Sequence, residues 1–127
     1  HLHVDHAGDL PAILKSANFA EPPARLALFG PDGRGLFPGT RQHVRALLDP
    51  KRGSFRYLAD WLAGPQPRLT ITEVPSADTD MPREILLRDQ PEYRLSAIAV
   101  HHGVVPALAF VVRSQGQMAV LAGDQSE

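Results

Sequence analysis

The residues best suited to chemistry in this sequence are gathered in its first six positions, which read His1-Leu2-His3-Val4-Asp5-His6. Imidazole nitrogen and carboxylate oxygen are ligands that suit zinc, and also manganese or iron. A mononuclear catalytic site typically takes three protein ligands and leaves a position for water, so four such groups exceed what one ion needs. The spacing therefore predicts two metal ions that share one water molecule.

The backbone conformation of this stretch decides which of its groups converge. If the stretch is extended, the twofold period of a strand places His1, His3 and Asp5 on one side. A following turn could swing His6 to the same side. A tag remnant is the alternative, but a tag is usually a homopolymer, whereas two aliphatic residues are interleaved here as at the end of a buried strand. The stretch is therefore interpreted as a metal-binding segment.

Further groups near the other end of the chain could complete such a site. His101 and His102 follow an expected strand, and neighbouring strand residues point to opposite faces, so one of the two is expected to reach the site and the other to fill a loop. Asp124 follows an apolar run and Gly123, where a carboxylate is as often a turn former as a ligand. The residues alone leave both assignments open.

Length and composition restrict the class of protein. The chain has 127 residues, the size of one domain, and 43% of them are hydrophobic, which is enough for a real core. A net charge of −1 does not indicate a nucleic-acid-binding surface. No apolar run is close to the length that a membrane-spanning helix needs. The absence of cysteine excludes disulfides and thiolate metal sites but leaves the cellular compartment open.

The hydrophobic periodicity predicts an α/β chain in which helices and strands are mixed first and consecutive strands follow. Asp9 is expected to cap a short helix that runs to about residue 17, and Thr40 a helix that stops at Asp49-Pro50. A third helical segment is expected over residues 55–62. Strands are expected over residues 25–29, 69–74, 84–88 and 93–100, and a hairpin over 106–113 and 117–122.

The middle of the chain carries weaker signals. His43 lies among polar residues of an expected helix, and a solvated side chain is the expectation, because a single histidine carries little motif information. Basic residues there could attract an anionic substrate, although such charges more often solvate helix faces. They are Arg41, Arg45, Lys51, Arg52 and Arg56. The loop 30–39 lacks the Gly-Lys-Ser/Thr of a phosphate loop, so it is not interpreted as nucleotide-binding.

The pattern His1-x-His3-x-Asp5-His6 resembles the HxHxDH signature of the metallo-β-lactamase-fold hydrolases. The next residues, 7–11, are similar to the branch that contains ribonuclease Z, related phosphodiesterases and arylsulfatases, and the loop 30–39 resembles its GPxG segment beside the active site. The resemblance implies a four-layer αββα sandwich that is longer than this chain. Residues 1–127 are then expected to be the central part of that domain, with both ends truncated.

The resemblance also implies a set of ligands for two zinc ions, with manganese or iron as alternatives. It assigns His1, His3 and His102 to the first ion, Asp5 and His6 to the second, and Asp124 to the bridge between them. His102 matches the motif HG…PALA(Y/F), with His101 as the alternative. The residue after the bridging aspartate is usually Thr in the family, whereas this chain has Gln125, and the family's last ligand, a downstream histidine, is absent.

The function that the resemblance implies is a metal-dependent hydrolase. A hydroxide bound to one or two zinc ions, oriented or deprotonated by Asp5, would cleave an ester, phosphodiester or sulfate-ester bond. Small-molecule esters or phosphodiesters are the expected substrates, with RNA as an alternative, because no basic arm is visible in the sequence. A homodimer is compatible with this function. The competing hypothesis is a non-catalytic metal-binding module of the same fold.

Overall fold

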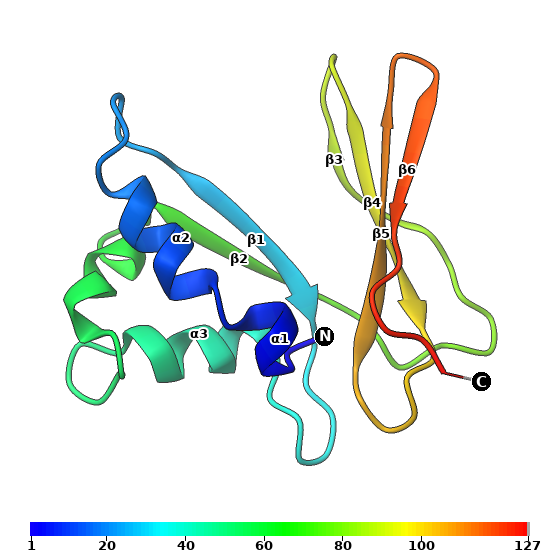
Figure 1. Ribbon diagram of the computed structural model, residues 1–127, viewed down its shortest axis with the longest axis horizontal. Coiled ribbons are helices and arrows are strands. Elements are labelled where there is room, and N and C mark those ends of the chain that lie inside the picture. The colour runs from blue at the N-terminus through cyan, green and yellow to red at the C-terminus, as the bar shows by residue number, and fades with distance from the viewer. Residues whose placement is uncertain (127) are drawn as a thin grey trace.

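Two parts of different construction stand side by side in the computed structural model, which describes residues 1–126 (Figure 1). The first part combines helices with a parallel pair of strands, and the second is a four-stranded antiparallel sheet. Helices and strands are mixed first and consecutive strands follow, as the periodicity predicts. The mixed α/β class is therefore confirmed. Among the described residues, every helix is too short or too polar to span a lipid bilayer.

The first part is a parallel strand pair with its crossover. Its elements are α1 (Val4–Ala7), α2 (Leu10–Ala17), β1 (Leu26–Pro31), α3 (Thr40–Leu48), the 3-10 helix η1 (Arg56–Leu62) and β2 (Leu69–Val74). Strand β1 pairs with β2 in parallel, from Leu26 opposite Leu69 to Pro31 opposite Val74. Parallel strands need a long connection, and α3 and η1 supply it here.

A continuous apolar core holds this first part together. Leu14 of α2, Leu48 of α3 and Trp61 of η1 are at most 1% exposed. Leu26 of β1 and Ile71 of β2 pack against the same cluster. Full burial of such a side chain contributes on the order of 1.5–3 kcal/mol, so the apolar positions of three helices fix their placement on the strand pair.

The second part consists of β3 (Ile85–Asp89), β4 (Arg94–Val100), β5 (Ala107–Ser114) and β6 (Gln117–Leu121), which are adjacent in chain order. The predicted hairpin is confirmed, because β5 and β6 are joined by Gln115 and Gly116. These two residues have φ values of 49° and 76°, as a type I′ turn requires at both central positions. The outer strand β6 is exposed along its whole length.

The helices α2 and α3 lie where they are expected, but neither predicted side chain makes a capping hydrogen bond. Thr40 is the first helical residue of α3, and its hydroxyl donates to the carbonyl of Pro31 at 2.9 Å. The backbone N–H of Arg41 donates instead to the Glu73 carboxylate at 2.9 Å, so a side chain from β2 takes the capping role. Asp9 precedes α2 as expected, but its side chain makes no capping hydrogen bond.

Candidate metal centre

The amino-terminal stretch ends in a turn of helix and does not form a strand. Residues 1–3 have no regular structure, and α1 begins at Val4, whose side chain is 83% exposed. The prediction of a buried, extended stretch is therefore wrong. The backbone N–H groups of His6 and Ala7 donate to the carbonyl of His3 at 3.0 and 2.9 Å. This turn brings the His6 ring to 4.0 Å from the His1 ring, centroid to centroid.

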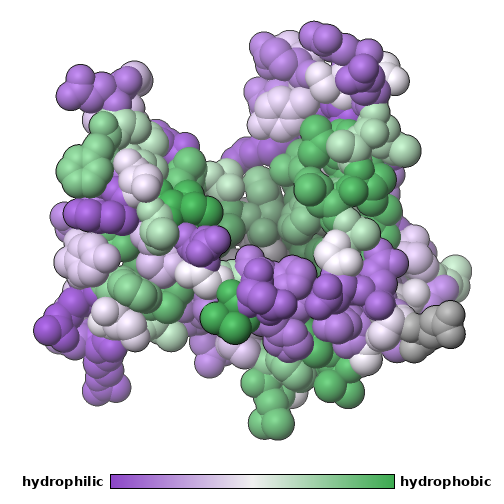
Figure 2. All heavy atoms as spheres, viewed as in Figure 1, coloured by the Kyte–Doolittle hydropathy of each residue, from purple (hydrophilic) through white to green (hydrophobic). Residues whose placement is uncertain are grey.

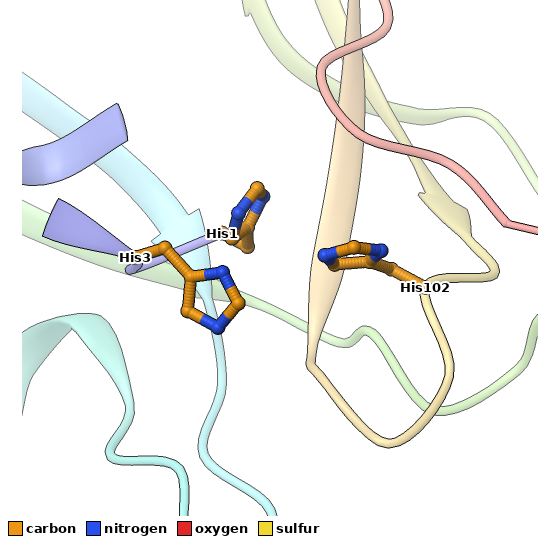
Figure 3. Close-up of side chains that lie close together, drawn as sticks. All are labelled: His1, His3 and His102. Atoms are coloured by element: carbon orange, nitrogen blue, oxygen red, sulfur yellow. The ribbon is translucent and has the colours of Figure 1, made fainter. Parts of the chain in front are cut away.

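Three imidazoles from opposite ends of the chain form a first group. His1 and His3 come from the segment before α1, and His102 comes from the loop after β4, with the three rings gathered around one space (Figure 3). The ring centroid of His1 is 4.6 Å from that of His3 and 4.8 Å from that of His102. One nitrogen of each ring lies within 4.8 Å of the others, so the three could share one ion.

A second group contains His1, His6 and Asp124, again with one ligand atom of each within 4.8 Å of the others. Oδ2 of Asp124 lies 3.4 Å from Nε2 of His6, 3.7 Å from Nε2 of His1 and 4.0 Å from Nε2 of His102. One carboxylate oxygen thus faces histidines of both groups, which is the position that a bridging ligand needs. His1 belongs to both groups, whereas the resemblance assigns it to the first ion alone.

Asp5 lies at the rim of the centre. Its side chain is exposed, and Oδ2 is 3.7 Å from Nε2 of His6. Neither group of three includes it. The structure therefore brings five of the six predicted ligands together in the two groups and leaves Asp5 beside them.

The burial of the ring nitrogens gives a reason for a cation at this place. Nε2 of His1 and Nε2 of His102 are buried and have no hydrogen-bond partner. A buried polar atom without a partner costs about 1–3 kcal/mol. Their distances to Asp124, 3.7 and 4.0 Å, are too long for hydrogen bonds. The donor set and the two unpartnered nitrogens fit a divalent cation such as zinc.

His101 has a separate role that the sequence does not reveal. Its Nδ1 lies 3.0 Å from the carbonyl oxygen of Ser126, which can only accept, so Nδ1 carries the proton and donates. In return the backbone N–H of Ser126 donates to the carbonyl of His101 at 3.0 Å. These two bonds hold the segment that carries Asp124 beside His102. A main-chain partner 25 positions away leaves no motif in the sequence.

His43 belongs to neither group of three, but its predicted solvation is wrong in part. The residue is half-buried on α3, and its Nε2 is buried without a hydrogen-bond partner. Burial lowers the pKa of His43 below its ordinary value of 6.5. The basic residues of this region are exposed, as expected of solvated helix faces: Arg41, Arg45, Lys51, Arg52 and Arg56.

The chain is similar to proteins named ribonuclease Z. It is 35% identical over 131 residues to those of Mycolicibacterium paratuberculosis and Mycobacterium avium, and 32% identical over 132 residues to that of Mycobacterium bovis. Each match covers 98% of this chain and 41% of the relative. The chain therefore spans about two fifths of the length of these curated relatives. No family model matches the chain.

Proposed function

Because this chain is a ribonuclease Z-like segment of the metallo-β-lactamase superfamily, we propose that the protein containing it is a metal-dependent hydrolase of phosphodiester bonds. The observation that carries the proposal is the convergence of five ligand-type side chains in two overlapping groups. The relatives' name favours a phosphodiester among the three ester classes that the sequence leaves open, because RNA is joined by phosphodiester bonds.

The residues present suit two zinc ions. His1, His3 and His102 would hold one ion, Asp5 and His6 would hold the other, and Asp124 would lie between them. The unpartnered Nε2 atoms of His1 and His102 support this assignment. When bound, two such ions supply Lewis acidity that lowers the pKa of water towards 7 and neutralises charge on the phosphate.

The side chains of this chain then have distinct tasks. Asp5 is exposed at the rim of the centre, so the carboxylate that would help to hold the second ion could also accept a proton from the attacking water or orient it. Asp124, which faces three histidines, would be shared between the two groups of ligands. His101 fixes the segment of Asp124 through Ser126. Completion of an αββα sandwich and a further histidine ligand would require residues outside this chain.

One observation favours a second candidate, a non-catalytic metal-binding module. Asp5 lies outside both groups of three, so the centre could bind a cation without a group placed to move a proton.

A homodimer is a separate proposal, which light scattering of the zinc-loaded protein would test.

The experiment measures metal content and hydrolysis of bis(4-nitrophenyl) phosphate by the protein that contains this chain. Two equivalents of zinc are expected, together with turnover that a chelator abolishes and zinc restores. Asp5→Asn should lower kcat by about 10²–10⁴-fold, because the loss of one positioned proton acceptor has this size, and it should weaken binding of the second zinc ion while the first is retained. His43→Gln, a change at a histidine outside both groups, is the control and should leave both properties unchanged.

The two candidates separate clearly in this experiment. Stoichiometric zinc without turnover of any phosphodiester would establish the binding module and reject the hydrolase. Full turnover that survives both His3→Ala and Asp5→Ala would mean that the centre is not the active site.

A further inference from the structure

A cleft with a volume of about 420 Å³ lies between α3 and the outer edge of β2. Small-molecule sites usually have volumes of this order, about 300–1,000 Å³. Two guanidiniums from α3, two apolar side chains from the segment 62–67 and residues of β2 form its walls. These residues are Arg41, Arg45, Leu62, Pro67, Leu69 and Ile71. None of them belongs to the two groups of metal ligands, so the cleft is a separate candidate site.

The outer edge of β2 is not paired with another strand among residues 1–126. The carbonyls of Arg68 and Val74 accept hydrogen bonds, at 2.8 and 3.0 Å, from N–H groups at the start of β1 and just beyond its end. The even-numbered residues of this stretch therefore face β1. Successive residues of a strand direct their backbone groups to opposite sides, so those of Leu69, Ile71 and Glu73 face outward.

Leu69 has buried backbone groups without partners on this outer edge. The residue is 2% exposed, and no hydrogen bond found among residues 1–126 reaches its outward N–H or C=O. Nearly all buried backbone groups in native proteins are paired. A ligand in the cleft that offers both an acceptor and a donor would satisfy these two groups.

Arg41 and Arg45 give the cleft a positive charge. Nη2 of Arg41 donates to the carbonyl of Ile71 at 2.7 Å, which holds this guanidinium against the edge of β2, and α3 runs beneath that strand in Figure 1. Arg45 is exposed one turn further along α3, a rise of about 6 Å. The ion pairs found among residues 1–126 include neither residue, so both guanidiniums are available to an anion such as a carboxylate.

The other groups of the cleft restrict the class of this anion. The carbonyl of Leu69 needs a donor, which the oxygens of an ionised phosphate diester do not supply. A carboxylate with an amide N–H on the neighbouring carbon supplies the donor and the negative charge together. Leu62 and Pro67 form an apolar wall that suits an aliphatic group on the same molecule.

We propose that the cleft between α3 and β2 binds an N-acylated aliphatic amino acid. The carboxylate lies at the two guanidiniums, the amide lies at the backbone of Leu69, and the aliphatic side chain lies against Leu62. A free N-acyl amino acid and the carboxyl terminus of a peptide share this chemistry. The proposal does not depend on the proposed hydrolase, because the metal ligands take no part in it.

The experiment titrates the zinc-loaded protein that contains this chain with four ligands and follows the amide resonances by NMR. N-Acetylleucine should bind and shift the amide resonance of Leu69. N-Acetylleucinamide lacks the carboxylate and should bind about tenfold more weakly, because it loses charge-assisted hydrogen bonds. N-Acetylglycine lacks the aliphatic group and should also lose about tenfold. 4-Methylpentanoate lacks the amide and should lose about fivefold.

A substitution on α3 tests the cation itself. Arg45 is exposed, so Arg45→Gln should leave the fold intact and weaken the binding of N-acetylleucine about tenfold. Arg52→Gln is the matched control, because Arg52 is exposed and does not line the cleft. It belongs to the loop after α3, over which hydrophilic residues project at the lower left of Figure 2. Its affinity should equal that of the parent.

A tripeptide, N-acetylglycylglycylleucine, identifies the source of the ligand. Binding at least as tight as that of N-acetylleucine, with the same shift at Leu69, assigns the cleft to the carboxyl terminus of a peptide. Weaker binding assigns it to a free N-acyl amino acid, and either result keeps the site. Equal binding of the four ligands, an unchanged affinity in Arg45→Gln, or no binding of N-acetylleucine overturns the proposal.

Discussion

The helical part and the antiparallel sheet bury different kinds of side chain. In the first part Trp61, Leu14 and Leu48 are at most 1% exposed and belong to one cluster. The buried residues of the sheet are mainly alanines, with Leu108 and Val111 as larger members. Val74, at the end of β2, packs against Ala97 and Leu108, so it joins the two parts through a small contact. The core of the first part is therefore packed with large side chains, whereas the sheet buries mainly small ones.

This difference explains how the candidate metal centre is supported on each side. His1, His3 and His6 come from the segment around α1, next to the helices of the filled core. His102 and Asp124 come from loops that follow β4 and β6, where loop hydrogen bonds replace packing. A cation held by both sets of ligands would link the two parts. It should stabilise the sheet more than the helical part.

Matched leucine truncations test the difference in packing most directly. Leu48→Ala should lower the free energy of unfolding by about 3–4 kcal/mol and Leu108→Ala by about 2 kcal/mol, because a cavity costs less where the surroundings can relax. Leu48 is 1% exposed within the helical core, whereas Leu108 is 5% exposed on a sheet. Denaturant unfolding of each variant measures the two losses. Equal losses would mean that the sheet is packed as tightly as the helical core.

Substitutions of His101 sharpen the comparison on the side of the sheet. His101→Ala should weaken zinc binding about tenfold, because a residue that orients a ligand segment commonly contributes that much. His101→Asn can place its amide N–H near the former position of Nδ1 and should restore most of the affinity, whereas His101→Gln reaches the position of Nε2 and should not. Competition with a chromophoric chelator measures the affinity. If all three variants bind zinc like the parent, other contacts hold Asp124 in place.

The smallest expected effect concerns His43 in the helical part. Burial lowers its pKa below 6.5, so the folded chain resists the charge that the unfolded chain accepts near that pH. The unfolded chain then binds more protons between the lowered pKa and 6.5, and the free energy of unfolding falls as the pH falls through this window. His43→Gln should remove this part of the pH dependence. Thermal unfolding of both proteins from pH 7.5 to 5 checks it, and parallel curves would contradict it.

Local sequence patterns predicted most of the secondary structure correctly. The proline at position 50 ends α3, the residues 115–116 form the expected hairpin turn, and apolar alternation marks β2. These features depend on neighbouring residues, so the sequence displays them. The caps were predicted less well, since Glu73, which caps α3, lies 32 positions from its partner Arg41. Long-range hydrogen bonds of this kind leave no local pattern.

The candidate site, too, was predicted in part from the sequence, and the rest became visible only in the structure. The resemblance to the ribonuclease Z branch, which the comparisons confirm, rests on short motifs of residue type and spacing, the clearest of them within the first eleven positions. The ligand roles of His1, His3, Asp5, His6, His102 and Asp124 stay predictions. The sequence left open which of two neighbouring histidines faces the cluster, and the folded chain turns His102 inward while His101 bonds to Ser126.

Residue types and their order were sufficient to indicate metal chemistry, because imidazoles and carboxylates have ligand properties that do not depend on the fold. The arrangement of these residues in space could not be predicted from their order in the sequence. The amino-terminal histidines converge through a helical turn where alternation suggested a strand, and the segment of Asp124 is tied to His101 by hydrogen bonds across 25 positions. Contacts between distant segments arise from the packing of the whole chain, and this is why folding was needed to reveal them.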